Sequence, residues 1–374
     1  MYFYRILFFI LLAQLFDEAK VFASIIPKTV SKCRSIQGPE ACEDIVIHHQ
    51  SGIAFMACGS EIGRRTQWWP PIDQLNTQTQ PREQPWIYNL ETDEIFPVSL
   101  KNFPKDTDIA LHGLGMYVDP YNSNKIALFF VNHRRSGSVI EVFDHTIGTK
   151  ELIYRETVSS ELIVTPNDVT PVSANEFYTT NDRRYTYKQE KLRQFESDTG
   201  RSWTNVIFHS SKNDTTFIAA EGISYANGII ANWNYTRIYV NSVGTGETII
   251  YDRREDNLLL EIERVHIGVA VDNQSIDEVS GEIYVAGFPD VPATFKYLLD
   301  PTGKSPPPPV LIAKISNVTK KAHPLLGSNY QVTKVLETNG SDFNSISIAA
   351  VDRKRNVILL GSILNKGITR CDLE

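Results

Sequence analysis

Carboxylate and side-chain amide residues occur at four places in this sequence where the surroundings are apolar, proline-framed or glycine-rich. They are Glu43 and Asp44 before Ile-Val-Ile, Asn167 and Asp168 between two prolines, Asn227 beside Gly228, and Asp272 and Asn273 after the apolar run 267–271. Carboxylate and amide oxygens without Cys or His are ligands that suit Ca²⁺ rather than Zn²⁺. These residues are separated along the chain by about one or more repeating units, so successive units could each bring ligands to one axis. Taken one at a time, each residue is better explained as a turn residue or a cap.

Two histidines accompany these oxygen ligands. His112 follows an apolar run and precedes a glycine, and His133 ends the strand-like run 127–133. A lone histidine of this kind is usually structural, whereas two on adjacent β-segments could hydrogen-bond each other as a general base and its partner. The sequence has no Gly-x-Ser-x-Gly, His-Glu-x-x-His, Gly-x-Gly-x-x-Gly or phosphate-loop motif. Metal-assisted hydrolysis is therefore favoured over covalent catalysis.

Short β-strands are the elements that must position these residues. Runs of four to seven residues rich in Val, Ile, Phe and Tyr, at 125–131, 138–143, 228–232, 237–240, 281–286 and 356–360, predict an all-β fold. Three phrases, VDPYNSNKIALFFV, IDEVSGEIYVAG and VDRKRNVILLGS, share an acidic residue, a turn and a β-run. Repeated four-stranded units build propellers, and six blades over about 340 residues give roughly 55 residues each. We expect an all-β, six-bladed β-propeller with a central tunnel; a pair of β-sandwiches is the alternative.

Helices and domain boundaries are scarce. Only the segment 189–195 has a pattern compatible with a helix. No linker divides residues 24–374, which we expect to form a single domain. The proline-rich stretch 305–309 indicates a surface connection between strands rather than a boundary.

The first 23 residues have the features of a secretory signal. Arg5 precedes an apolar run at 6–16, and the segment 21–23 resembles a cleavage sequence ending at Ala23. We expect residues 1–23 to be removed and the protein to be extracellular. The alternative is an uncleaved apolar anchor that associates the protein with a membrane or a lipid surface.

Secretion would allow the four cysteines to form disulfides. Cys33, Cys42, Cys58 and Cys371 can pair in three ways. A Cys33–Cys371 bridge would tie the two termini together, as a closed ring of blades needs, and Cys42 and Cys58 would then form a local second bridge. In the alternative, Cys42 and Cys58 remain free buried thiols.

Composition limits the classes of partner. A hydrophobic fraction of 42% is typical of a globular protein, and a net charge of −7 argues against a nucleic-acid partner. Exposed sequons of a secreted chain accept glycans, which we expect at Asn213, Asn234, Asn317 and Asn339.

From about Lys32 to its end, the chain resembles the serum paraoxonase/arylesterase family. The matching motifs, in order, are Cys42-Glu-Asp-Ile45, Ser51-Gly-Ile-Ala-Phe55, His112-Gly113, Val131-Asn-His133, Pro166-Asn-Asp168, Phe177-Tyr-Thr-Thr-Asn-Asp182, Glu221-Gly222 to Ala226-Asn-Gly228, Val271-Asp-Asn273 and Cys371-Asp-Leu373. Any one of these motifs is weak, but several in one order make the resemblance specific.

The resemblance implies a six-bladed propeller with two Ca²⁺ ions in its central tunnel. It implies that a catalytic ion is bound by Glu43, Asn167, Asn227, Asp272 and Asn273, and a structural ion by Asp44, Asp168 and the carbonyl oxygen of Leu114. Because neighbouring side chains on an extended segment diverge, each adjacent pair could serve both ions. The resemblance also implies the Cys33–Cys371 disulfide, and it makes Asn273 a buried ligand whose sequon should carry no glycan.

The implied reaction is hydrolysis of small apolar lactones and aryl esters. Ca²⁺ would polarise the carbonyl, and His112, assisted by His133, would activate the attacking water. The segment 64–80 departs from the family, and its Trp68 and Trp69 have equal reason to wall an apolar pocket or to pack the loop. A Cys42–Cys58 disulfide would be an addition to the family pattern, and it would stiffen the neighbouring Glu43. The alternative functions are a non-catalytic, calcium-stabilised secreted binding propeller and a gluconolactonase-like sugar-lactone hydrolase with one ion.

Overall fold

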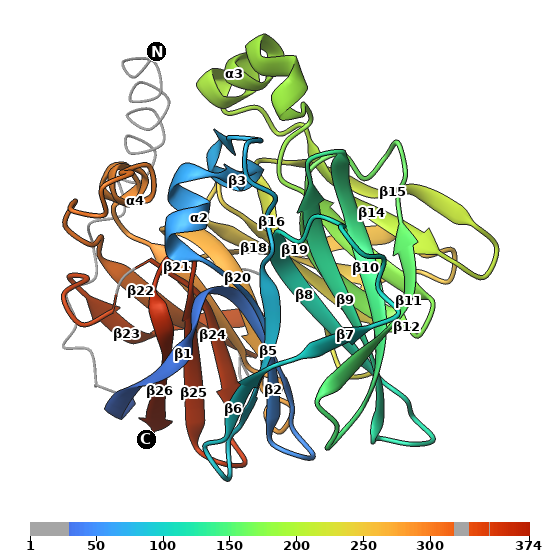
Figure 1. Ribbon diagram of the computed structural model, residues 1–374, viewed down its shortest axis with the longest axis vertical. Coiled ribbons are helices and arrows are strands. Elements are labelled where there is room, and N and C mark those ends of the chain that lie inside the picture. Colours follow the sequence, from blue (N-terminus) through green and yellow to red (C-terminus); the bar gives the residue numbers. More distant parts are fainter. Residues whose placement is uncertain (1–29, 318–328, 344) are drawn as a thin grey trace.

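The computed structural model describes residues 30–317, 329–343 and 345–374, so the expected signal peptide, residues 1–23, lies outside the described residues. Long strands make up most of the fold, and helices α2, α3 and α4 lie together at one end of the molecule (Figure 1). Within the described ranges, no helix is long and apolar enough to span a membrane.

The strands form a six-bladed β-propeller, which confirms the expected fold class. Blade 1 contains the second half of β1 (Val30–His48), β2 (Ile53–Gly59), β5 (Gln84–Asn89) and β6 (Ile95–Pro97). Blade 2 contains β8 (Leu111–Val118), β9 (Lys125–Arg134), β10 (Gly137–Thr146) and β11 (Glu151–Val158), with β7 (Ser99–Lys101) at its edge. Blade 3 contains β12 (Pro166–Ser173), β13 (Glu176–Asn181), β14 (Thr204–Ser210) and β15 (Thr215–Ile223).

Blade 4 contains β16 (Ala226–Ala231), β17 (Arg237–Ser242), β18 (Glu247–Arg253) and β19 (Leu259–His266). Blade 5 contains β20 (Ala270–Ile276), β21 (Ile283–Phe288), β22 (Val310–Asn317) and β23 (Tyr330–Thr338). Blade 6 contains β24 (Ile346–Asp352), β25 (Val357–Ser362), β26 (Lys366–Leu373) and the first half of β1. The inner strands β1, β8, β12, β16, β20 and β24 contact one another in a closed ring around the tunnel.

Strand β1 is shared by the first and the last blade. Its residues 30–40 pair with β26, and its residues 40–48 pair with β2. The disulfide Cys33–Cys371 joins β1 to β26, and the disulfide Cys42–Cys58 joins β1 to β2. The ring of blades is therefore closed both by main-chain pairing and by a covalent bond.

Apolar side chains fill the interfaces between neighbouring blades, so most strands are buried on both faces. Strand β9 shows the pattern: Ile126, Leu128 and Phe130 pack against blade 1, whereas residues 127, 129 and 131 pack against blade 3. Successive side chains of a strand point to opposite faces. This double burial explains why the run 125–131 is continuously apolar rather than alternating.

The recurring acidic residue of the three repeated phrases closes a hairpin. Asp119, Asp277 and Asp352 each stand at the turn between the first and second strand of a blade. Each carboxylate accepts a hydrogen bond from a backbone N–H two or three residues later. Such side-chain bonds to nearby backbone favour turns.

The expected helix at 189–195 corresponds to α3 (Glu190–Thr199), which extends four residues further and follows the 3-10 turn η3 (Tyr187–Gln189). The expectation of one helix was wrong, because α2 (Glu61–Thr66) and α4 (Val291–Leu298) also form. Helices of six and eight residues are too short to show a clear helical period. Between α2 and β5 lie β3 (Trp68–Trp69), η2 (Pro70–Ile72) and β4 (Gln74–Leu75). Residues 305–309 lie within one blade, as expected, but they follow the helix α4 rather than a strand, and most of them are half-buried.

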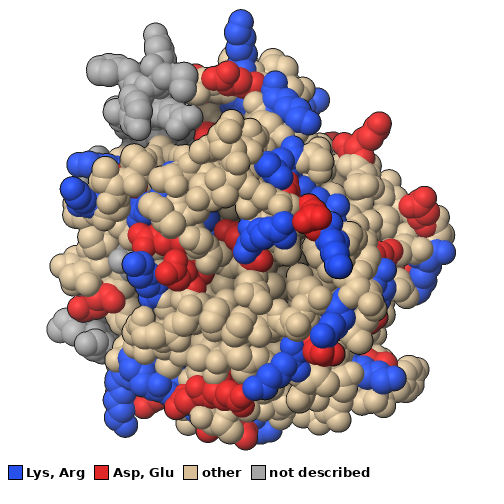
Figure 2. All heavy atoms as spheres, in the orientation of Figure 1, with Lys and Arg blue, Asp and Glu red and all other residues tan. Residues whose placement is uncertain are grey.

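On the face seen in Figure 2, Lys and Arg are interspersed with Asp and Glu over a largely uncharged surface. The predicted glycosylation residues Asn213, Asn234, Asn317 and Asn339 are all exposed. Asn273, in contrast, is buried in the tunnel wall, with a relative exposure of 1%.

Candidate active site and metal centre

All six inner strands carry a register shift of the β-bulge type, near the beginning of the strand in five of them and in the middle of the long strand β1. A bulge sets extra residues of one strand against its partner and re-aims their side chains. The bulged segments are 40–44, 111–114, 166–169, 226–229, 271–274 and 346–348. These segments include Glu43, Asp44, His112, Leu114, Asn167, Asp168, Asn227, Asp272 and Asn273, so every residue predicted for the tunnel apart from His133 belongs to one of them. The adjacent pairs thus diverge on a bulged backbone, not on a regularly alternating one.

Two glycines allow the inner strands to approach closely at this level. A Cβ atom on Gly113 would lie 2.4 Å from the Cα of Asp168, and one on Gly228 would lie 2.7 Å from the carbonyl oxygen of Asp272. Neither distance leaves room for a side chain, and glycine is the residue used where backbones approach this closely. The bulges of neighbouring blades are therefore in direct contact.

All the predicted metal ligands except Asn273 line one of two pockets of the tunnel, and Asn273 lies behind Glu43, to which it donates a hydrogen bond. The upper pocket, beside α4, has an empty volume of ≈ 750 Å³. The lower pocket has an empty volume of ≈ 1030 Å³. Among the residues lining the upper pocket are Glu43, His112, Asn167, Asn227 and Asp272. Among those lining the lower pocket are Asp44, Leu114 and Asp168.

The lower-pocket carboxylates are held by the backbone of neighbouring strands. Asp44 accepts N–H groups from the next residue and from Leu114, each at 2.8 Å. Asp168 accepts N–H groups from the next residue and from Ile229, each at 2.7 Å. Both side chains therefore link their own inner strand to that of the following blade.

The upper group contains oxygens that no protein donor satisfies. Glu43 Oε2, Asn167 Oδ1 and Asn273 Oδ1 are buried and have no hydrogen-bond partner within the described part of the chain. The Nδ2 of Asn273 donates to the other oxygen of Glu43 at 2.6 Å, which fixes both side chains. Buried oxygens without partners are unfavourable, and a cation among them would remove the penalty.

The buried carboxylates of the tunnel also favour a bound cation. Burial raises the pKa of Asp44 to about 7 and that of Asp272 to about 8, the latter with a contribution from Asp44. Burial, followed by repulsion from neighbouring carboxylates, raises the pKa of Glu43 and that of Asp168 well above their usual ranges. Four carboxylates in one tunnel therefore favour either bound protons or a bound cation.

The residues present fit calcium. No group of three or more His, Cys, Asp or Glu side chains in the described ranges could by itself hold a metal ion. The donor set of the tunnel mixes carboxylates with the amide oxygens of Asn167, Asn227 and Asn273. Such a mixture of hard oxygens matches the preference of Ca²⁺.

The two histidines form a buried pair. His112 Nδ1 and His133 Nε2 are 3.0 Å apart and share a hydrogen bond, and His133 Nδ1 shares one with the hydroxyl of Ser138 at 2.9 Å. His112 Nε2 lies 3.6 Å from Glu43 Oε1. Burial, followed by the nearby positive charge of other groups, lowers the pKa of His133 to about 3 and places that of His112 well below its usual value. These lowered pKa values favour neutral rings at pH 7, and His112 lines the upper pocket.

Apolar side chains wall the rest of the upper pocket. They include Trp69, Ile72, Phe288, Val291, Phe295 and Leu298. Trp68 does not line it; its Nε1 donates to the His133 carbonyl at 2.7 Å and its ring packs edge-on against Tyr187. Trp69 therefore walls the pocket, whereas Trp68 packs the loop, so each of the two expected roles belongs to one tryptophan.

Three residues near the site had no signal in the sequence. Tyr225 lines the upper pocket with a left-handed backbone, φ 56°, and the Arg183 guanidinium lies 3.9 Å from the centre of its ring. Ser138 holds His133. Arg64 is fully buried near the histidine pair, and its charge contributes to lowering the pKa of both rings. Each acts through tertiary neighbours, so only the Asn-Gly motif after Tyr225 could have drawn attention to one of them.

Together, the fold and the site define a class: a β-propeller with a polar, oxygen-rich central tunnel. The Arylesterase family model matches residues 24–373, and the chain belongs to that family. It is 25% identical over 354 residues to "Serum paraoxonase/arylesterase 1" of Mus musculus, covering 94% of this chain and 92% of the relative.

It is also 26% identical over 353 residues to "Serum paraoxonase/lactonase 3" of Homo sapiens, covering 93% of this chain and 90% of the relative. Among solved structures it resembles regucalcin of Agrobacterium tumefaciens, with a TM-score of 0.50 and 11% identity over 94% of this chain and 95% of that one. That likeness concerns the fold alone. Family membership places the chain among ester and lactone hydrolases.

Proposed function

We propose that the protein is a secreted, Ca²⁺-dependent hydrolase of small apolar lactones and aryl esters. One observation carries the proposal: among the described residues, buried oxygens of Glu43, Asn167 and Asn273 lack hydrogen-bond partners, and Glu43 and Asn167 line an apolar pocket together with His112 of the histidine pair. Family membership supports the reaction class.

Two ions are proposed because the ligands form two sets. The upper ion would be held by Glu43, Asn167, Asn227, Asp272 and Asn273. The lower ion would be held by Asp44, Asp168 and the carbonyl oxygen of Leu114. When bound, the upper Ca²⁺ supplies a Lewis acid that polarises the substrate carbonyl.

The chain itself supplies the proton transfer. His112 Nε2 would take a proton from the attacking water while a bond forms between the water oxygen and the carbonyl carbon. His133 would hold the ring of His112 in position through their hydrogen bond of 3.0 Å. When the bond to the leaving alcohol breaks, the same proton would pass to its oxygen, which regenerates the neutral pair.

The pocket wall supports an apolar substrate. Trp69, Phe288 and Phe295 line it, and no Lys or Arg of the described residues is part of its lining. A neutral acyl or aryl group would bury its surface there. The two disulfides support the proposed extracellular location, because such bonds persist in oxidising compartments.

The decisive experiment is an assay of the purified protein on aliphatic lactones and phenyl esters, with Ca²⁺ and with a chelator. Hydrolysis that is lost with chelator and restored by Ca²⁺ supports the proposal. No hydrolysis, with two ions bound by calorimetry, would indicate the non-catalytic binding propeller. A stoichiometry of one ion with activity on sugar lactones would indicate the gluconolactonase-like function.

A matched pair of variants tests the histidine role. His112→Gln should lower kcat by about 10²- to 10⁴-fold without weakening Ca²⁺ binding. His209→Gln is the control, because His209 is equally buried but bonds to Thr216 in blade 3, away from the tunnel. Equal activity of the two variants would contradict a base role for His112.

A further inference from the structure

Leu111, the residue before the proposed base, has its backbone held on both sides by one ion pair. Its N–H donates to Glu83 Oε2 at 2.6 Å, and its carbonyl accepts from Arg64 Nη2 at 2.8 Å. The pairing with β9 does not use these groups, because the ladder bond here runs from the His133 N–H to the Ala110 carbonyl. The bulge that presents His112 is therefore fixed by side chains at its first residue.

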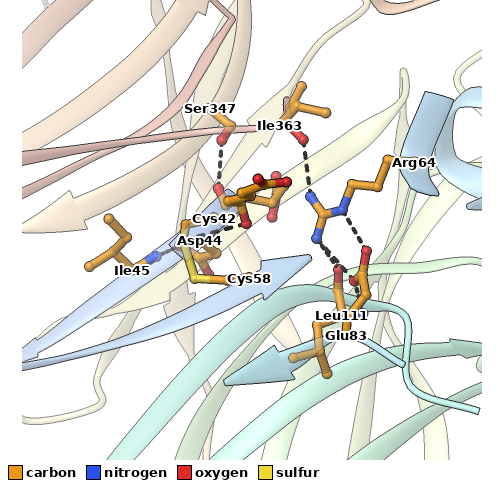
Figure 3. Close-up of a disulfide and its surroundings, with 11 residues drawn as sticks. Cys42, Asp44, Ile45, Cys58, Arg64, Glu83, Leu111, Ser347 and Ile363 are labelled. Carbon is orange, nitrogen blue, oxygen red and sulfur yellow. Dashed lines mark hydrogen bonds and ion pairs between the residues drawn. A yellow bond between two sulfur atoms is a disulfide. The ribbon is translucent and has the colours of Figure 1, made fainter. Parts of the chain in front are cut away.

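Arg64 makes contacts with several parts of the pocket at once. Its side chain is fully buried and pairs with Glu83 through Nε at 2.9 Å and Nη2 at 3.2 Å. Its Nη1 donates to the carbonyl of Ile363, a pocket-lining residue of blade 6, at 3.3 Å. Figure 3 shows the guanidinium between these partners.

The guanidinium also positions Trp69. It lies 4.3 Å from the centre of the Trp69 ring, and that ring packs edge-on against His112 with centroids 5.1 Å apart. The indole Nε1 points to the same Leu111 carbonyl at 3.4 Å. The Arg64 guanidinium therefore contacts both Trp69, which lines the pocket, and the backbone next to His112, the proposed base.

The local sequence makes room for this pair. A Cβ atom on Gly59 would lie 2.0 Å from Glu83 Oε1 and 2.6 Å from Arg64 Nε, so a larger residue there would have to displace the ion pair. Lysine could replace the charge of Arg64 but not its planar fork of donors, which is needed to reach carbonyls of two blades.

We propose that Arg64 is a positioning residue that aligns His112 and Trp69, two side chains that are in contact with each other in the lining of the substrate pocket. The proposal rests on the proposed function for its catalytic consequence but not for its geometry. Arg64 does not line the pocket, so it acts through the residues that it holds.

The test uses three variants of the full secreted protein with Ca²⁺ saturating. Arg64→Lys keeps the charge beside Glu83. The double variant Arg64→Met with Glu83→Gln removes both charges and so leaves no unpaired buried ion. Both should lower kcat by about 10- to 100-fold, with a smaller change in KM, because a displacement of about 1 Å at a base has that effect. Arg65→Met is the control: Arg65 is also buried in α2, but it donates to the carbonyls of Tyr297 and Asp300.

A second readout does not depend on activity. In protein labelled with ¹³C-histidine, the ring signal of His112, identified by its loss in His112→Gln, is sensitive to the ring current of Trp69. It should move in both Arg64 variants and stay in place in Arg65→Met. Unchanged kcat per folded molecule, or an unmoved signal in a folded Arg64 variant, would overturn the proposal. If the parent protein hydrolyses nothing, the proposed function fails while the signal still decides the positioning role.

Discussion

Substituting the two residues of the Asn167-Asp168 pair separately should give different losses. Asp168 accepts two buried backbone N–H groups, from the next residue and from Ile229. Asp168→Ala leaves both donors unsatisfied, at about 1–3 kcal/mol each, so the folded state should lose about 2–6 kcal/mol. That is a large share of a typical stability of about 5–15 kcal/mol.

Asn167 has little of this structural role. Within the described part of the chain its Oδ1 has no hydrogen-bond partner, and burial raises the pKa of the nearby Asp182, an effect that the Asn167 side chain partly offsets. Asn167→Ala should therefore destabilise the protein by only about 1–2 kcal/mol. Because the side chain faces the upper pocket, kcat/KM should fall by about 10²- to 10³-fold, as when one electrostatic group of an active site is removed.

Urea unfolding in saturating Ca²⁺, together with kcat/KM on one phenyl ester, measures both effects. Thr170→Val is the matched control on the same strand, because its hydroxyl accepts a single N–H, from Ala231, at 3.1 Å. It should cost about 1 kcal/mol and leave kcat/KM unchanged. Small and equal losses in the Asn167 and Asp168 variants would show that the pair is a structural element of the strand and would refute the two-ion reasoning.

Three further outcomes are expected. In chelator, the folded protein should lose stability as the pH rises from about 4 to about 8, because the raised pKa values of Asp44 (about 7) and Asp272 (about 8) let the folded state hold protons that the unfolded state releases. Thermal melts should therefore give a higher melting temperature at pH 5 than at pH 8.5. With Ca²⁺ present, the melting temperature should be higher at pH 8.5. Removing the Cys33–Cys371 bridge, whose sequence separation is 338, should cost up to about 6 kcal/mol by loop entropy, seen as a lower urea midpoint; no change would show that the main-chain pairing of β1 closes the ring alone. If the protein is expressed through the secretory pathway of a eukaryotic host, Asn234→Gln should lower its intact mass by one glycan, since Asn234 is exposed in a turn; an unchanged mass would show an unused sequon.

The fold was predictable because blade strands have a distinctive sequence pattern. Short apolar runs ended by Gly, Asn, Asp or Ser matched β9, β10, β16, β17, β21 and β25 within a few residues. The proposed oxygen ligands were conspicuous because polar residues inside apolar strands are rare. The resemblance assigned their proposed roles, which bulk composition could not have done.

The backbone that presents these residues was not predictable. A bulge depends on the register between two strands, and register is a property of the pair rather than of either segment. Arg64 was hidden for a related reason: an arginine in a short polar segment looks exposed until Glu83, nineteen residues later, meets it in a buried ion pair. The helices α2 and α4 carry too few residues for a periodic signal.

The sharing of β1 between two blades has a consequence for biosynthesis. The segment 30–40 leaves the ribosome early, but its partner β26 follows more than three hundred residues later. At about 5–20 residues per second, that delay is about 17–70 s. Throughout it, an unpaired strand edge and the thiol of Cys33 stay available to wrong partners, including the nearby Cys42 and Cys58. The first and last blades can therefore be completed only after translation of the last strand.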